Sequence, residues 1–244
     1  MIYVCLHFLG GSVRSWSPLA ERLAPGARWL AIDLPGFGAA TAIPGDTVTT
    51  AVGYVADSIR AEPPGPFTLM GHSMGAKIAT VLARRAEDGE AGLEGLARIV
   101  LLAGSPPSPE PMDEAKRQDM LGWFTRGSDQ AEAEAFIAAN VTRPLPRDLT
   151  ATAVADVLRA DPARWRAWLA GGSREDWADR VGLLRTPALI VAGADDPYLG
   201  PEGQARFTRP HFQTAHQVTL PETKHLLPLE RPDALFDLIK AHEQ

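Results

Sequence analysis

The chain has 244 residues, of which 45% are hydrophobic and 22% are charged, a composition typical of one globular domain with or without an insertion. It carries 24 basic and 30 acidic side chains, a formal charge of -6, without a dense lysine and arginine cluster, so no nucleic-acid partner is expected. Cys5 is the only cysteine, which excludes an intrachain disulfide, and no apolar stretch is long enough for a membrane span or follows a basic leader. We expect a cytoplasmic protein with no membrane partner.

Short apolar runs alternate along the chain with longer helical patterns, an order typical of βα units on a parallel sheet. Several of these runs are apolar at consecutive positions, as expected for strands that helices cover on both faces. Strands are predicted over 2–7, 29–33, 67–71, 97–103, 188–192 and 216–220. Helices are predicted over 16–23, 48–61, 74–87, 202–207 and 232–242.

The alternation stops between residues 105 and 184. A proline cluster at 105–109 (Ser-Pro-Pro-Ser-Pro) marks the break, because proline continues neither a helix nor a central strand. The residues that follow have helical patterns. We therefore predict an α/β core of 1–104 and 185–244, with a helical cap, residues 105–184, inserted over one end of the sheet. The cap is rich in aromatic side chains: Trp123, Phe124, Trp165, Trp168 and Trp177.

Residues 71–75 read Gly-His-Ser-Met-Gly, a G-x-S-x-G pattern centred on Ser73. The pattern lies between the predicted strand 67–71 and the predicted helix 74–87, so Ser73 is expected at a tight strand-to-helix turn that requires small neighbours. Such a turn lifts the hydroxyl above the carboxyl ends of the strands, where open α/β sheets bind their ligands. Ser73 is therefore predicted to be a catalytic nucleophile.

A serine nucleophile needs a base, and the base needs a carboxylate to orient it. Two loops that follow the last predicted strands carry suitable groups. Asp195 and Asp196 follow the strand 188–192, and His225 follows the strand 216–220. Because both loops lie at the end of the sheet expected for the serine, His225 is predicted to be the base. Loop position alone leaves the acid open between the two aspartates.

These motifs together resemble the α/β-hydrolase superfamily over nearly the whole chain. Residues 6–12 (Leu-His-Phe-Leu-Gly-Gly-Ser) are similar to the family's oxyanion loop, and residues 33–38 to its Asp-x-Pro-Gly-x-Gly turn. Residues 224–232 are similar to the segment that bears the catalytic histidine. The resemblance implies a mostly parallel sheet of about six strands, with helices on both faces, that begins at the family's third strand.

The resemblance also implies roles for particular residues. A Gly-x-x-Asp pattern gives the acid role to Asp196. The family's two oxyanion donors are backbone amides, which correspond here to Met74 and Leu9. Phe8 occupies the place where the family usually has glycine, so its amide is the alternative to that of Leu9. A pocket wall formed by Phe8 and the cap aromatics Trp123, Phe124, Trp165 and Trp168 is a further expectation.

Four of the five other histidines can be assigned roles outside catalysis from their positions. His72 and His7 are expected to pack or to bond nearby backbone, and His211 and His216 lack the spacing of a metal-binding pair. No metal and no other cofactor is expected.

The sequence thus predicts a serine hydrolase, most simply a carboxylesterase, that acts on small-molecule esters through an acyl-enzyme on Ser73. A type II-like thioesterase, another acyl or carbon–carbon bond hydrolase, and a lyase of the menaquinone-pathway type are alternatives within the same fold. A small-molecule receptor that uses the hydrolase pocket is the non-enzymatic alternative. Neither the substrate nor the oligomeric state is specified by any motif.

Overall fold

The computed structural model describes residues 1–22, 27–123 and 130–243. In these residues, six strands form one sheet in the order β2-β1-β3-β4-β5-β6, and every neighbouring pair is parallel. The prediction of a parallel sheet of about six strands is confirmed, and the predicted strand ends agree to within one residue. The strands are β1 (Ile2–Leu6), β2 (Arg28–Ile32), β3 (Phe67–His72), β4 (Leu96–Leu102), β5 (Ala188–Gly193) and β6 (Ala215–Leu220).

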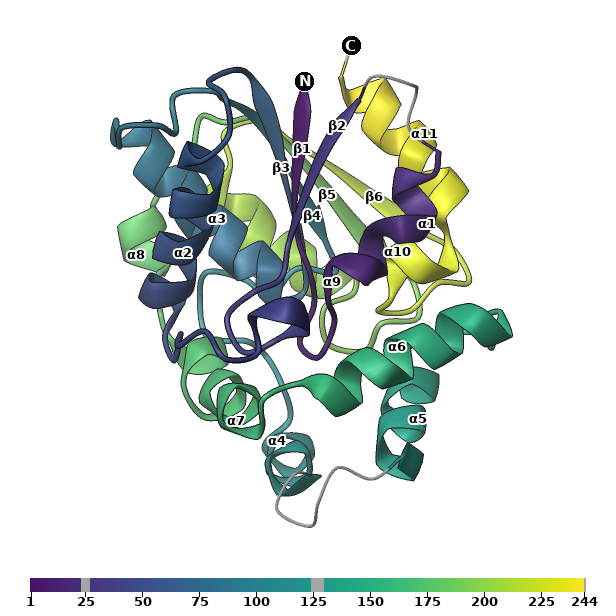
Figure 1. Ribbon diagram of the computed structural model, residues 1–244. Coiled ribbons are helices and arrows are strands. Elements are labelled where there is room, and N and C mark those ends of the chain that lie inside the picture. Colours follow the sequence, from purple (N-terminus) through teal and green to yellow (C-terminus); the bar gives the residue numbers. More distant parts are fainter. Residues whose placement is uncertain (23–26, 124–129, 244) are drawn as a thin grey trace.

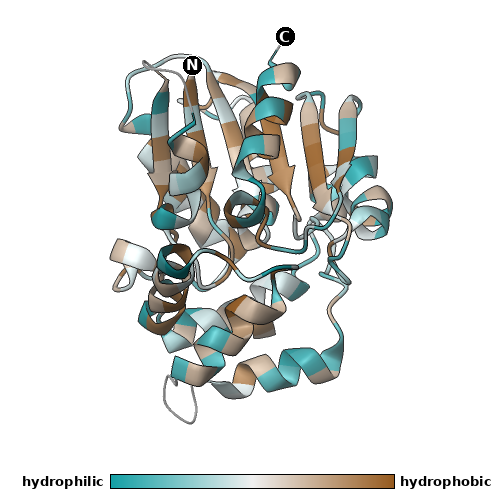
Figure 2. Ribbon diagram, turned by 90° about the vertical axis from the view of Figure 1, so that its right-hand side faces the viewer, coloured by the Kyte–Doolittle hydropathy of each residue, from teal (hydrophilic) through white to brown (hydrophobic). Residues whose placement is uncertain are grey.

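Helices cover both faces of the sheet (Figure 1). One face carries α2 (Val48–Arg60), α3 (Met74–Glu87) and α8 (Ala178–Val181), and the other carries α1 (Ser17–Ala20), α10 (Leu227–Glu230) and α11 (Pro232–His242). Alternate residues of a strand therefore enter different cores: Val4 and Leu6 pack toward α2 and α3, whereas Cys5 packs toward α1 and α11. The strands are apolar along most of their length, while the helices carry both apolar and polar faces (Figure 2).

Two predicted helices differ from the observed ones. The stretch predicted as a helix over 16–23 is a 3₁₀ turn, Val13–Trp16, followed by the single turn of α1. The stretch predicted over 202–207 is α9 (Pro201–Gly203), which continues as a π-helical turn over Gln204–Thr208. Both segments are too short for a helical period to be read reliably from the sequence.

Four helices between β4 and β5 lie across the carboxyl end of the sheet (Figure 1). They are α4 (Glu114–Gly122), α5 (Gln130–Ala139), α6 (Arg147–Arg159) and α7 (Pro162–Ala170), and they precede α8 in the chain. Apolar residues of α4–α7 belong to the same buried cluster as β1, β3 and α3, so the cap and the sheet share a core. We keep the name cap for residues 105–184; its separate status as a domain stays a prediction. Within the described residues, no helix is both long and apolar enough to cross a membrane.

Candidate active site

Ser73 lies between the last residue of β3 and the first residue of α3, at the carboxyl edge of the sheet. Its backbone has φ 52° and ψ -116°, a region that non-glycine residues rarely occupy and that costs conformational energy. Two hydrogen bonds hold this conformation: the Ser73 amide donates to the Leu102 carbonyl (3.0 Å), and the Ser73 carbonyl accepts from the Ser105 amide (3.1 Å). The strained turn is therefore fixed by the end of β4.

The two glycines of the motif are required by close backbone contacts. A Cβ atom at Gly75 would lie 2.3 Å from the Leu6 carbonyl oxygen, and one at Gly71 would lie 2.5 Å from the Gly75 carbonyl oxygen. Both separations are far below any normal van der Waals contact, and the obstructing atoms are backbone. Glycine at both positions thus lets α3 start this close to β1.

His225 and Asp196 are joined by a hydrogen bond. The His225 Nδ1–H donates to Asp196 Oδ2 at 2.7 Å, and the side chains are only 14% and 3% exposed. The other carboxylate oxygen, Asp196 Oδ1, accepts from the amides of Tyr198 and Leu199, both at 3.0 Å. The carboxylate is therefore held so that one oxygen always faces the imidazole.

Asp195, the alternative acid, points elsewhere. Its Oδ2 accepts a hydrogen bond from the Thr142 hydroxyl (2.8 Å), and the residue is exposed. The two aspartates lie in a turn in which the Asp196 amide donates to the Gly193 carbonyl (3.3 Å), and within it only Asp196 is bonded to the imidazole. The geometry favours Asp196 over Asp195.

The backbone around His225 is anchored to the cap and to the nucleophile turn. The amides of His225 and Leu226 both donate to the Asn140 carbonyl at 3.1 Å. The His225 carbonyl accepts from His72 Nε2–H at 2.7 Å, and the two rings lie 5.4 Å apart. Burial disfavours the imidazolium form of His225, but the charge and hydrogen bond of Asp196 outweigh burial and raise the pKa of His225. His72 thus holds the backbone of His225, the predicted base.

Ser73, His225 and Asp196 all line one cavity of about 90 Å³ beneath the cap. Its wall is mostly apolar, with contributions from the oxyanion loop, the cap and the loop after β5. Besides Ser73, Asp196 and His225, its polar lining residues are Glu110, Lys116, Asn140, Tyr198 and Lys224. A space this small is suited to a short organic group. The apolar lining residues are Phe8, Leu9, Met112, Met120, Phe136, Ala139, Trp168, Pro197 and Leu199.

The predicted aromatic wall is present only in part. Phe8 and Trp168 line the cavity, but among the described lining residues Trp123 and Trp165 do not occur. Those two rings stack on each other with centroids 5.6 Å apart and pack against Phe136, a lining residue that the sequence analysis missed. Trp123 and Trp165 therefore build the core of the cap behind the wall. The prediction for Phe124 lies outside the described residues.

The oxyanion loop is held by His7. His7 Nδ1–H donates to the Phe8 carbonyl (2.7 Å), while His7 Nε2 accepts from the Leu34 amide (2.9 Å), which requires the neutral Nδ1–H tautomer. The Gly11 amide also donates to the Phe8 carbonyl (2.9 Å). The carbonyl and the N–H of a trans peptide point in opposite directions. Because the Phe8 carbonyl points toward its donors, His7 and Gly11, the Leu9 amide of the same peptide points away from them. Leu9 lines the cavity, so the geometry favours Leu9 over Phe8 as the donor.

The Met74 amide is the second candidate donor. Met74 is the first residue of α3, and the first amides of a helix have no acceptor within the helix. The positive end of the helix dipole adds to the field of this amide. The Met74 side chain is buried and lines a different cavity, beside α2 and α7. Only its backbone is therefore available to a ligand bound at Ser73.

Comparison with known proteins identifies the family. The model of the alpha/beta hydrolase family matches residues 3–238. This chain belongs to the alpha/beta hydrolase family. Over 141 residues it is 33% identical to 2-succinyl-6-hydroxy-2,4-cyclohexadiene-1-carboxylate synthase of Salmonella heidelberg, a match that covers 54% of this chain and only 50% of that relative. It is 24% identical to (E)-2-((N-methylformamido)methylene)succinate hydrolase of Acinetobacter baylyi, over 98% of this chain and 88% of the relative.

Solved structures of several enzymes share the fold of this alpha/beta hydrolase. An esterase from Exiguobacterium antarcticum superposes with a TM-score of 0.86 at 19% identity and covers 100% of this chain and 92% of its own. The type II thioesterase from the borrelidin biosynthetic cluster superposes with a TM-score of 0.74 at 25% identity, and the match covers 100% of this chain and 92% of the thioesterase. A bromoperoxidase from Bacillus anthracis superposes with a TM-score of 0.86 at 16% identity, and the match covers 99% of this chain and 91% of the bromoperoxidase. These likenesses establish the fold and leave the substrate open.

Two buried charged residues of the alpha/beta hydrolase were not identified from its sequence. Glu110 lines the cavity and is 9% exposed, and no hydrogen-bond partner for its Oε2 occurs in the described part of the chain. Burial raises the pKa of Glu110, although the Ser105 hydroxyl beside it acts in the opposite direction. No pattern marked Glu110, because it follows a proline-rich loop whose path depends on tertiary contacts.

The second of these residues is Lys77, which is fully buried in the first turns of α3. Its Nζ donates to the carbonyls of Gly172 (3.2 Å), Ser173 (3.3 Å) and Glu175 (2.8 Å). Burial lowers the pKa of Lys77 to about 8. Lys77 thus joins α3, the helix that follows Ser73, to the end of the cap. Within the described residues, no group of three histidine, cysteine, aspartate or glutamate side chains could hold a metal ion.

Proposed function

We propose that this alpha/beta hydrolase is a serine esterase that cleaves carboxylic esters of small molecules through an acyl-enzyme on Ser73. The observation that carries the proposal is the Asp196–His225 hydrogen bond of 2.7 Å in the cavity that Ser73 lines. In that bond Nδ1 keeps its proton, so Nε2 is the nitrogen that is free to accept one. The small cavity supports short acyl groups rather than lipids.

In the proposed reaction, His225 Nε2 takes the proton from Ser73 Oγ as the oxygen attacks the ester carbonyl. The tetrahedral oxyanion is stabilised by the Met74 and Leu9 amides, and loss of one such donor costs about 100- to 1,000-fold in kcat. The imidazolium, which Asp196 stabilises, then returns the proton to the leaving alcohol. A water molecule repeats both steps on the acyl-enzyme and releases the acid, so that no cofactor is required.

The test is a panel of p-nitrophenyl esters from acetate to octanoate. We expect turnover that favours the short esters, and loss of nearly all turnover in Ser73→Ala. The matched control is Ser58→Ala, which removes a hydroxyl bonded to the Tyr54 carbonyl on α2 and should keep full activity. Full activity of Ser73→Ala would refute the proposal, and saturable binding of esters without turnover by the wild type would favour a receptor.

The 33% identity to the synthase of Salmonella heidelberg, over 54% of this chain, supports a second candidate, a lyase. The structural likeness to a type II thioesterase supports thioesters as substrates. Acyl thioesters assayed beside the oxygen esters separate these possibilities. Turnover of thioesters at a kcat/KM well above that of matched oxygen esters would move the assignment to a thioesterase. Activity only on the synthase's substrate would move it to a lyase.

A further inference from the structure

The cap contacts the oxyanion loop directly. A Cβ atom at Gly10, which has φ +82°, would lie 2.8 Å from Trp165 Cζ3 and 3.2 Å from Val157 Cγ2. Helices α6 and α7 are therefore packed against the peptide that follows Leu9, with no room for a side chain between them. The position of the cap and the position of this loop are coupled by contact.

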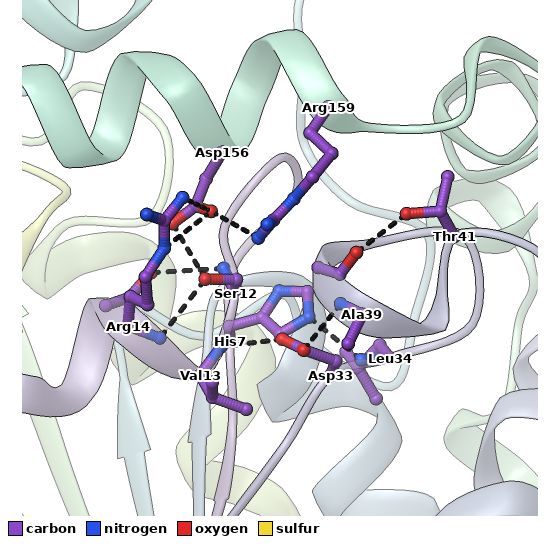
Figure 3. A network of polar contacts seen from close by, with 12 residues as sticks. His7, Ser12, Val13, Arg14, Asp33, Leu34, Ala39, Thr41, Asp156 and Arg159 are labelled. Carbon is purple, nitrogen blue, oxygen red and sulfur yellow. Dashed lines mark hydrogen bonds and ion pairs between the residues drawn. The ribbon is translucent and has the colours of Figure 1, made fainter.

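A buried carboxylate on α6 adds a polar link to this packing (Figure 3). Asp156 is 1% exposed, and its Oδ2 accepts a hydrogen bond from the Ser12 hydroxyl at 2.7 Å. Its Oδ1 accepts from Arg14 Nε (3.1 Å) and Nη2 and from Arg159 Nη2 (2.9 Å). These three donor residues give the buried charge the partners that it requires. Two of these donors belong to the segment that continues the oxyanion loop.

Ser12 is held in a single orientation by a second set of bonds. Its hydroxyl accepts from the Arg14 amide (3.1 Å), and its own amide donates to the Ser15 hydroxyl (3.3 Å), which together form the cap of the turn Val13–Trp16. The next amide, that of Val13, donates to Asp33 Oδ1 at 2.8 Å. The carboxyl end of the oxyanion loop is thus fixed by Asp156 and Asp33, while His7 fixes its other end.

We propose that Asp156 is a positioning residue through which the cap, by way of Ser12, keeps the Leu9 amide aimed at the reacting carbonyl. The inference rests on the proposed esterase function. The peptide that binds the oxyanion lies between His7 and Ser12, and Ser12 is bonded to Asp156 of the cap. The cap thus acts on the chemical step as well as shaping the pocket. Neither Asp156 nor Ser12 lines the cavity, so any effect on rate must be transmitted through the loop.

The first experiment is a double-mutant cycle of Ser12→Ala and Asp156→Ala, assayed with p-nitrophenyl acetate. In both single variants the Leu9 amide is displaced rather than removed. We therefore expect kcat to fall by about 10-fold, less than the loss expected when an oxyanion donor is removed, and KM to stay nearly unchanged. Since the two residues act through one bond, the double variant should be no slower than the slower single variant. Arg159→Gln is the control. Arg159 also bonds the Asp156 carboxylate but lies on α6 rather than in the loop, so this variant should keep the wild-type kcat.

A readout specific to the oxyanion separates positioning from loss of fold. Affinity for a trifluoromethyl ketone, whose adduct with Ser73 carries an oxyanion, should weaken in parallel with kcat/KM in Ser12→Ala and Asp156→Ala. A merely structural role would lower the melting temperature and leave both kcat and the ketone affinity per folded molecule unchanged. That outcome would overturn the proposal.

Amide hydrogen exchange tests the link without any substrate. In Asp156→Ala and Ser12→Ala, the amides of residues 8–13 should exchange faster, while those of β3 and β4 keep the wild-type rate. If the wild type cleaves no ester, the esterase proposal fails, and the exchange experiment still decides whether α6 holds the loop. Unchanged exchange over residues 8–13 in both variants would refute the positioning role whatever the activity.

Discussion

Replacement of Asp196 by asparagine should stop catalysis by changing the tautomer of His225, with the geometry of the site intact. In the structure, Asp196 Oδ1 accepts from the Tyr198 and Leu199 amides, and Oδ2 accepts from His225 Nδ1–H. An asparagine oxygen will keep the two amide bonds, which leaves the NH₂ group facing the imidazole. Nδ1 must then accept a hydrogen bond, and the ring proton moves to Nε2.

An Nε2–H imidazole cannot take the proton of Ser73. The corresponding change in a serine protease lowers kcat about 10,000-fold, and we expect a loss of that order for Asp196→Asn. The variant should remain folded, because the side chain keeps its volume and the two backbone bonds. The assay is the kcat for p-nitrophenyl acetate, with the melting temperature measured in parallel. The acid limb of the pH profile should also move to lower pH, since burial lowers the pKa of His225 and Asp196 is what raises it.

Asp195→Asn is the matched control. Asp195 is exposed and bonded to Thr142, so the substitution should change kcat by less than a few-fold. Retention of more than a tenth of the wild-type rate by Asp196→Asn would refute the tautomer argument. A steep loss in Asp195→Asn with a mild one in Asp196→Asn would transfer the acid role to Asp195.

Two further predictions concern titratable groups near the base. The Glu110 carboxylate contributes to the raised pKa of His225, so in Glu110→Gln the acid limb of kcat/KM should move to lower pH. Burial, together with the charge of His225, lowers the pKa of His72 to about 3, whereas an unfolded histidine titrates near 6.5. The unfolded chain therefore binds one more proton between these values, and the free energy of unfolding falls as the pH falls, by at most about 1.4 kcal/mol per unit. Urea unfolding of His72→Gln should show a shallower slope over pH 4.5 to 6.5 than the wild type.

Each of these predictions has a control and a contrary result. Glu114→Gln removes an exposed carboxylate of α4 that is paired with Arg174, and it should leave the pH profile where it is. An unmoved acid limb in Glu110→Gln would show that Glu110 does not act on His225. For His72→Gln, whose amide can still donate to the His225 carbonyl, a slope equal to that of the wild type would contradict the buried, neutral state of His72.

The sheet was largely predictable because its signals are local. Most strands are short apolar runs bounded by polar or glycine residues. Helix α3 has a clear helical period, so its predicted range 74–87 equals Met74–Glu87. Ser73 was identifiable for the same reason: the close backbone contacts at positions 71 and 75 require glycine, and both glycines lie within two residues of Ser73 in the sequence. The two short segments at 16–23 and 202–207 had no comparable signal.

The missing parts of the site depend on contacts between distant residues. Which of the two aspartates faces His225 is decided by the amides of the following turn, and which peptide faces the cavity is decided by the bond from His7 to the Phe8 carbonyl. Glu110 and Asp156 gain their surroundings only when the cap folds onto the sheet. The aromatic content of the cap likewise did not indicate which rings form the wall and which form the core behind it.

Lys77 has a consequence for anyone who wishes to exchange the cap for that of another enzyme. Its ammonium group is surrounded by the carbonyls of Gly172, Ser173 and Glu175, which all belong to the part that would be exchanged. A graft without an equivalent turn would leave a buried cation uncompensated one turn from the nucleophile, a cost of several kcal/mol. A chimera should therefore either retain residues 172–175 or replace Lys77 by an apolar residue of similar length. The junction at this lysine, as much as the pocket wall, limits which caps the scaffold will accept.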